Sequence, residues 1–134
     1  MFPFGHGLSY STFRYTDLVC PGTISDSGDC HAQFTLTCDG PVAGAEVVQV
    51  YVRDVSCRLP RPTKELRAFQ KIQLEPGQGK QVEFVLDREA WKFWDDSIDA
   101  WVAEAGEFEI MIGSSSADIR LRASTTLTRD LTWR

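Results

Sequence analysis

The residues best suited to acid–base chemistry are three carboxylates within one short polar segment. Asp95, Asp96 and Asp99 lie between aromatic residues. In a later segment Glu107 and Glu109 alternate with apolar residues, so we expect both to point outward on the same face. Hydrolysis by a carboxylate pair needs two such groups across a pocket, about 5 to 9.5 Å apart. A solvated surface is the more ordinary interpretation, because Asp and Glu are seldom fully buried without a partner. We therefore expect no catalytic residue in this chain.

Neither a serine nucleophile nor a metal site is indicated elsewhere. Residues 114–116 are serines, but they lack the strand-to-helix G-x-S-x-G context of a nucleophile elbow and are interpreted as turn residues. The cysteines are spaced too irregularly for a Cys-x-x-Cys zinc pattern, and only His6 and His31 could assist them. We expect neither a metal nor a cofactor.

The chain has four cysteines, at Cys20, Cys30, Cys38 and Cys57. Cys20 and Cys30 could flank a hairpin and form a disulfide. Cys38 is in phase with the apolar residues Phe34 and Leu36, so we expect it to be a buried thiol. These positions do not indicate whether the protein works in an oxidising or a reducing compartment.

Length and charge restrict the class of protein. A chain of 134 residues with 43% hydrophobic and 25% charged residues is expected to form one globular domain. The net charge of -5, with acidic and basic residues interspersed, argues against nucleic-acid binding, which requires a clustered basic face. No apolar run approaches the ~20 residues of a membrane span, and no export signal is apparent, so localisation stays open.

Apolar and polar residues alternate with a period of two in five segments, which predicts an all-β fold. No long amphipathic helix is indicated. Each alternating segment has one face to bury, and two packed antiparallel sheets would bury all of them. The five segments are residues 32–38, 48–53, 81–87, 108–112 and 119–122.

Turn residues separate these segments. Residues 75–78 (EPGQ) carry Pro and Gly at the two central positions of a type II turn, which predicts a hairpin between segments 66–74 and 80–86. Residues 113–118 and 39–41 are further breaks between strands. Asp87 could cap one short helical turn at the start of residues 87–94.

The N-terminal segment is unusually apolar for a terminus, since termini are normally polar and mobile. Phe2, Phe4, Leu8 and Tyr10 form a cluster that we expect to lie against another surface. His6, between two glycines, is expected to fix a turn at such an interface rather than to contact a substrate. The chain therefore resembles the end of a longer protein.

Five sequence blocks together resemble the C-terminal fibronectin type III-like domain of glycoside hydrolase family 3, the β-glucosidase and β-xylosidase family. The resemblance covers nearly the whole chain, and the first and last blocks are the most specific. It implies an immunoglobulin-like antiparallel β-sandwich. The blocks are FPFGHGLSYSTF (2–13), AGAEVVQVYVRD (43–54), RPTKELRAFQKIQLEPGQ (61–78), FVLDREAWKFWDD (84–96) and GEFEIMIGSSSADIRL (106–121).

In that family the catalytic carboxylates belong to domains that precede this signature, so the resemblance implies that this chain alone is not an enzyme. It implies instead a stabilising accessory domain that docks on the catalytic domains of a β-glucosidase-like parent hydrolysing O-glycosyl bonds. We expect residues 1–12 to be a docking segment, 13–127 the domain and 128–134 a tail. The expected docking residues are Phe2, Phe4, His6, Leu8, Tyr10, Arg58 and Arg61.

Two other functions are compatible with the sequence. Trp91, Trp94 and Trp101 could stack on sugar rings in a free-standing carbohydrate-binding module, which would require a coplanar row of exposed rings. The basic, proline-containing loop that carries Arg58 and Arg61 could instead serve a protein-interaction module. An isolated chain could also self-associate through its apolar docking residues.

Overall fold

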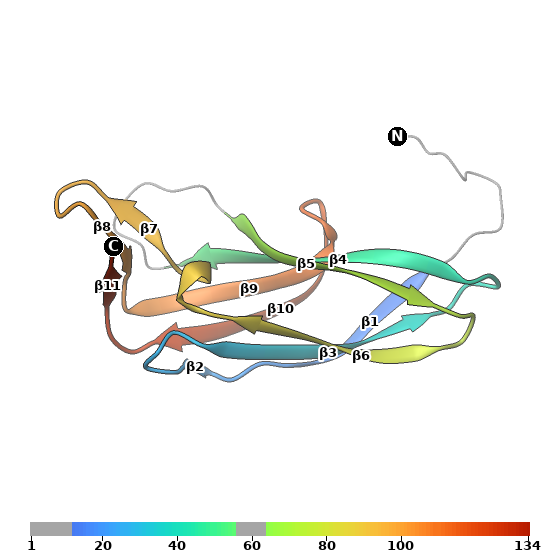
Figure 1. The fold of residues 1–134 in the computed structure, drawn as a ribbon. Helices are drawn as coiled ribbons and strands as arrows, with labels where there is room; N and C mark the ends of the chain where they lie inside the picture. The colour runs from blue at the N-terminus through green and yellow to red at the C-terminus, as the bar shows by residue number, and fades with distance from the viewer. Residues whose placement is uncertain (1–11, 56–63) are drawn as a thin grey trace.

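The computed structural model describes residues 12–55 and 64–134 (Figure 1). The seven residues expected to dock, together with Cys57, lie outside this part of the chain. The elements in order are β1 (Phe13–Val19), β2 (Thr23–Ile24), β3 (Cys30–Cys38), β4 (Gly44–Asp54), β5 (Glu65–Leu74), β6 (Gly79–Leu86), a 3₁₀ turn (Arg88–Ala90), β7 (Phe93–Asp95), β8 (Ala100–Ala103), β9 (Gly106–Ser115), β10 (Asp118–Leu127) and β11 (Leu131–Trp133).

Two sheets pack against each other, and this confirms the predicted all-β sandwich (Figure 1). One sheet has the strand order β1-β3-β6 and the other β2-β10-β9-β4-β5. All five alternating segments form strands, which lie in β3, β4, β6, β9 and β10. Pairing is antiparallel except between β2 and β10, which are parallel.

The core lies between the two sheets and takes one face of each long strand. On β3 the buried positions are alternate residues, from Cys30 to Cys38, as the sequence pattern predicts. Cys38 is among them, which confirms the buried thiol. Trp91 also lies in the core, with its ring 5.0 Å from that of Phe108.

The turn at residues 75–78 was predicted correctly, but the hairpin was not. Gln78 N donates to Glu75 O over 2.9 Å, and Gly77 has a φ of 78°, as a type II turn requires. However, β5 pairs with β4, whereas β6 pairs with β3 in the other sheet. Gly77 N donates to the carbonyl oxygen of Cys38, so the turn is attached to the end of β3. The turn therefore carries the chain across from one sheet to the other.

The predicted cap at Asp87 is present. Its carboxylate accepts a hydrogen bond from Glu89 N at 2.9 Å and begins the short 3₁₀ turn. This turn positions Trp91 over the end of the core.

A third small sheet, with the order β11-β8-β7, lies at one end of the sandwich (Figure 1). Its strand β11 lies within residues 128–134, which we expected to be a tail. Leu131 pairs with Ala103 on β8, and both Leu131 and Trp133 pack against the core. The alternation is too short in β11 to be recognised from the sequence, but its cross-strand pairing orders the segment.

Candidate docking surface

The three tryptophans considered for sugar stacking do not form a common surface. Trp91 has only 1% of its surface exposed and donates from its indole nitrogen to Gly28 O at 2.8 Å. It is a core residue, and the expectation that it could stack on a sugar was wrong. The sequence could not distinguish it from its neighbours, because the chain leaves strand geometry at the 3₁₀ turn.

Trp94 and Trp101 lie opposite each other on β7 and β8, and Trp133 of β11 lies opposite Trp101. The rings of Trp94 and Trp101 meet edge to face, with 5.1 Å between centroids and an angle of 76°. Lys92 Nζ lies 4.2 Å from the centre of the Trp101 ring, and the Arg88 guanidinium 4.4 Å from that of Trp133. The Trp94 and Trp101 rings are not coplanar, and cations cover the Trp101 and Trp133 rings, so the geometry does not favour a sugar platform.

Asp95 and Glu109, two of the five candidate carboxylates, are occupied by local contacts. Asp95 accepts hydrogen bonds from the backbone and the hydroxyl of Ser97, at 3.0 and 2.6 Å, and so closes its own turn. Glu109 pairs with Arg53 at 3.1 Å and Arg122 at 3.4 Å across neighbouring strands. Within residues 12–55 and 64–134, no three His, Cys, Asp or Glu side chains come together in an arrangement that could hold a metal.

An apolar surface that the sequence analysis did not identify lies on the outward face of β4 and β5. We call it the β4–β5 surface and define it by Val47, Leu66 and Phe69, whose exposed fractions are 42%, 48% and 68%. Phe69 lies opposite Gln49, and Leu66 lies opposite Tyr51. The outward side of this edge thus presents large apolar side chains to solvent, where polar residues are usual.

A β-bulge explains why this surface is difficult to find in the sequence. Leu66 and Phe69 are three positions apart, yet their partners Tyr51 and Gln49 are two positions apart. The pairing shifts between Val50 and Tyr51, which leaves Arg67 as the additional residue of β5. A strict period-two pattern would place Leu66 and Phe69 on opposite faces.

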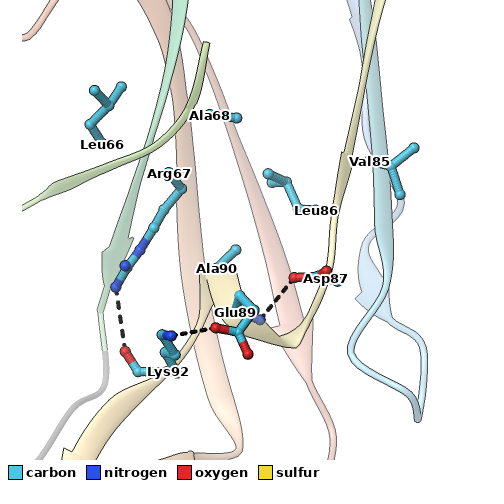
Figure 2. A pocket seen from close by; sticks show the side chains of 9 residues that line it. All are labelled: Leu66, Arg67, Ala68, Val85, Leu86, Asp87, Glu89, Ala90 and Lys92. Atoms are coloured by element: carbon cyan, nitrogen blue, oxygen red, sulfur yellow. Dashed lines mark hydrogen bonds and ion pairs between the residues drawn. The ribbon is translucent and has the colours of Figure 1, made fainter.

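A groove of about 380 Å³ continues from this surface between the edge strands β5 and β6 (Figure 2). Leu66 from β5 and Val85 from β6 are apolar groups along it, and the 3₁₀ turn contributes Glu89 and Ala90. The Gln70 side chain bridges the two edges, because its amide donates to the Glu83 carbonyl oxygen at 2.6 Å. The groove is therefore a seam between the two sheets.

Two of the four charged side chains that line the groove, Lys92 and Glu89, are paired with each other. Lys92 forms an ion pair with Glu89, and Arg67 donates to the Lys92 carbonyl oxygen at 3.4 Å (Figure 2). The hydrogen bond from Lys92 lowers the pKa of the Glu89 carboxyl, so this group is ionised at neutral pH. Arg67 also forms an ion pair with Glu65. The groove thus combines apolar margins with two cationic and two anionic side chains. Such a surface is suited to contact with another protein surface rather than to capture of an ion.

The fold defines a β-sandwich domain, and comparisons with known proteins agree. Residues 46–116 match the model of the fibronectin type III-like domain, and the chain belongs to this family. It is 45% identical, over 125 residues, to thermostable β-glucosidase B of Acetivibrio thermocellus, covering 92% of this chain and 17% of that protein.

Solved structures give the same relationship. The glycoside hydrolase family 3 β-glucosidase of Bifidobacterium adolescentis superposes on this chain with a TM-score of 0.83 and 36% sequence identity. The match covers 94% of this chain and 18% of the Bifidobacterium chain. β-Glucosidase 3B of Thermotoga neapolitana, determined in complex with glucose, superposes with a TM-score of 0.85 and 32% sequence identity. The match covers 99% of this chain and 18% of the Thermotoga chain. The chain thus spans less than one fifth of the length of each of these relatives. In the described part of the chain, no helix is long and apolar enough to cross a membrane.

Proposed function

We propose that this chain is a non-catalytic accessory domain that docks on the catalytic domains of a family 3 β-glucosidase through the β4–β5 surface. The observation that carries the proposal is the exposure of Phe69, Leu66 and Val47 on one face of a sheet. Large apolar side chains gathered on one exposed face mark protein–protein contacts in proteins that otherwise present polar surfaces. The relatives supply the partner, because each contains a matching segment within a β-glucosidase several times longer.

The energetics favour a large apolar contact in this position. Burial of each large apolar side chain contributes about 1.5–3 kcal/mol. Within one polypeptide the two surfaces are held at a high effective concentration, so even a modest patch suffices for stable association. The docking residues 1–12 and the loop with Arg58 and Arg61 would add to this contact, which would limit movement of the catalytic domains.

The role is structural rather than chemical. The local carboxylates are used in a turn, at Asp95, and in ion pairs, at Glu109. Glycoside hydrolysis requires a carboxylate pair on either side of a bound sugar. We propose that this pair belongs to the partner domains.

Replacement of the matching segment of A. thermocellus β-glucosidase B by this chain tests the proposal. The chimera should retain aryl-glucoside turnover and thermal stability, whereas an enzyme from which the segment is deleted should lose both. The chain alone should hydrolyse neither aryl-glucosides nor aryl-xylosides. Turnover by the chain alone, or a deletion enzyme as stable and active as the chimera, would contradict the proposal.

A further inference from the structure

Two thiols from consecutive parts of the sandwich meet at its edge. Cys20 follows β1, and Cys30 begins β3, the strand with which β1 pairs. Their sulfur atoms lie 3.8 Å apart and share a hydrogen bond that either thiol can donate. Cys30 is buried and Cys20 is half-buried, so one member of the pair can be reached from solvent.

The geometry favours bond formation between these two residues over the other described cysteine. A disulfide requires an S–S separation of about 2.05 Å, so the sulfur atoms have less than ~2 Å to move, within the range of a small side-chain rotation. Cys38 lies at the opposite end of β3, and its thiol donates to the Val42 carbonyl oxygen at 3.5 Å. Cys20 and Cys30 are therefore the matched pair.

The hydrogen bond also prepares the pair for reaction. Donation from the Cys20 thiol lowers the pKa of the Cys30 thiol, because it stabilises the thiolate. The same hydrogen bond, together with burial, raises the pKa of the Cys20 thiol, so Cys30 carries the charge at rest. The solvent-accessible Cys20 becomes the attacking thiolate by passing its proton across the hydrogen bond to Cys30. The thiolate is the form that attacks a disulfide.

We propose that Cys20 and Cys30 are an oxidation site that forms a disulfide by exchange with a small-molecule disulfide such as oxidised glutathione. The Cys20 thiolate attacks one sulfur of the external disulfide and expels a thiolate, which leaves a mixed disulfide. The Cys30 thiolate then attacks the Cys20 sulfur, forms the internal bond and expels the second thiolate. The two protons from the cysteines end on the two released thiols, so the protein is oxidised by two electrons and the external disulfide is reduced by two.

The bond would fasten the segment between β1 and β3. Its ends are ten positions apart, and it includes β2 and the turn whose Gly28 carbonyl oxygen accepts the Trp91 indole. Closing such a loop restricts the unfolded chain and so stabilises the folded one. The domain would consequently be more resistant to unfolding in an oxidising environment.

The test uses the 134-residue chain with Cys57→Ser, which removes the cysteine outside the described residues. After incubation with oxidised glutathione and capture of free thiols with N-ethylmaleimide, peptide mapping without reductant should show Cys20 linked to Cys30. The melting temperature should rise by roughly 5 °C or more relative to the reduced chain. Cys38→Ser is the control for a cysteine outside the pair. Because this position is buried, the substitution should lower the melting temperature of the reduced and the oxidised chain alike, so the linked peptide and the rise on oxidation should both be retained.

Cys20→Ser should abolish the linked peptide and the increase in melting temperature. Because Cys20 is half-buried at the margin of the core, this variant disturbs the packing less than Cys30→Ser would. Maleimide on both Cys20 and Cys30 after oxidation, or bridges only to Cys38, would overturn the proposed site. A linked peptide without a change in melting temperature would overturn the proposed stabilisation.

Discussion

The indole nitrogen of Trp91 donates to the carbonyl oxygen of Gly28 over 2.8 Å, which joins the segment after β6 to the turn before β3. The ring itself is buried beside Phe108. One side chain therefore contributes to both the core and the closure of the sandwich end.

Trp91→Phe should reduce the free energy of unfolding by about 1–3 kcal/mol, because it removes the hydrogen bond to Gly28 O and part of a buried ring. Trp91→Ala should cost about 3–5 kcal/mol. Urea unfolding followed by circular dichroism measures both. Trp94→Phe, at a ring that is 41% exposed, is the control and should change stability by less than ~1 kcal/mol. Equal losses at the two positions would contradict the assignment of Trp91 to the core.

Gly28→Ala should destabilise the domain by about 1–3 kcal/mol. Gly28 has a φ of 95°, and a Cβ atom there would lie 2.8 Å from the Arg88 Cβ. Gly22→Ala is a matched control, because a Cβ atom at Gly22 has no heavy atom within 4 Å. Thermal melts of the two variants compare them directly. If Gly28→Ala were as stable as Gly22→Ala, the close approach to Arg88 would be wrong.

Glu46→Gln should stabilise the folded chain at pH 7 by up to ~1 kcal/mol and lose this advantage in acid. Burial raises the pKa of the Glu46 carboxyl, which accepts a hydrogen bond from the Tyr15 hydroxyl at 2.7 Å. A raised pKa in the folded state means that the protonated carboxyl favours folding and that this contribution is lost as the pH rises through the raised value. Glutamine keeps the acceptor for Tyr15 without the charge.

Urea unfolding between pH 4 and 8 measures how the stability difference between Glu46→Gln and the parent chain depends on pH. Glu83→Gln, at an exposed position of β6, controls for the change in net charge.

Asp118 affects the free energy of unfolding with the opposite pH dependence, because hydrogen bonds from Arg120 first and Ser114 second lower the pKa of its carboxyl. That contribution is present above the unfolded-state pKa and is lost as the pH falls. A Glu46→Gln advantage that grew towards acid would contradict the burial of this carboxyl.

Titration with soluble β-glucan oligosaccharides should leave the tryptophan fluorescence unchanged. Trp91 is buried, Trp94 and Trp101 meet edge to face, and Lys92 covers part of the Trp101 ring. Stacking on a sugar requires an uncovered aromatic face. Saturable quenching that Trp94→Ala abolishes would instead support the carbohydrate-binding alternative.

Most strands of the sandwich could be predicted from the sequence, because successive side chains of a strand point to opposite faces. The alternation of apolar and polar residues therefore matches the alternation of buried and exposed positions. In β3, Phe34 and Leu36 are apolar and buried, while Thr35 and Thr37 point outward and are less buried. The turn at Gly77 was also predictable, since its positive φ favours glycine. Turn type is local, however, whereas the choice of partner strand is not, so the same residues could not show that β6 pairs with β3.

The β4–β5 surface could not be predicted from the sequence. The bulge near Arg67 interrupts the alternation that would have placed Leu66 and Phe69 on one face. In β11, a pairing of three residues orders Leu131–Trp133, which is too short for a pattern to emerge. Both features depend on contacts between distant segments rather than on local residue preferences.

The measurement that tests the docking role most directly is thermal inactivation of the chimeric β-glucosidase with the double substitution Leu66→Ser and Phe69→Ser. Val19→Ser is the control, because Val19 is also an exposed apolar strand residue but lies on β1, away from the β4–β5 surface. If this surface is buried against the catalytic domains, the double variant should inactivate several-fold faster, while the control matches the parent chimera. Equal inactivation rates for all three proteins would contradict docking through the β4–β5 surface.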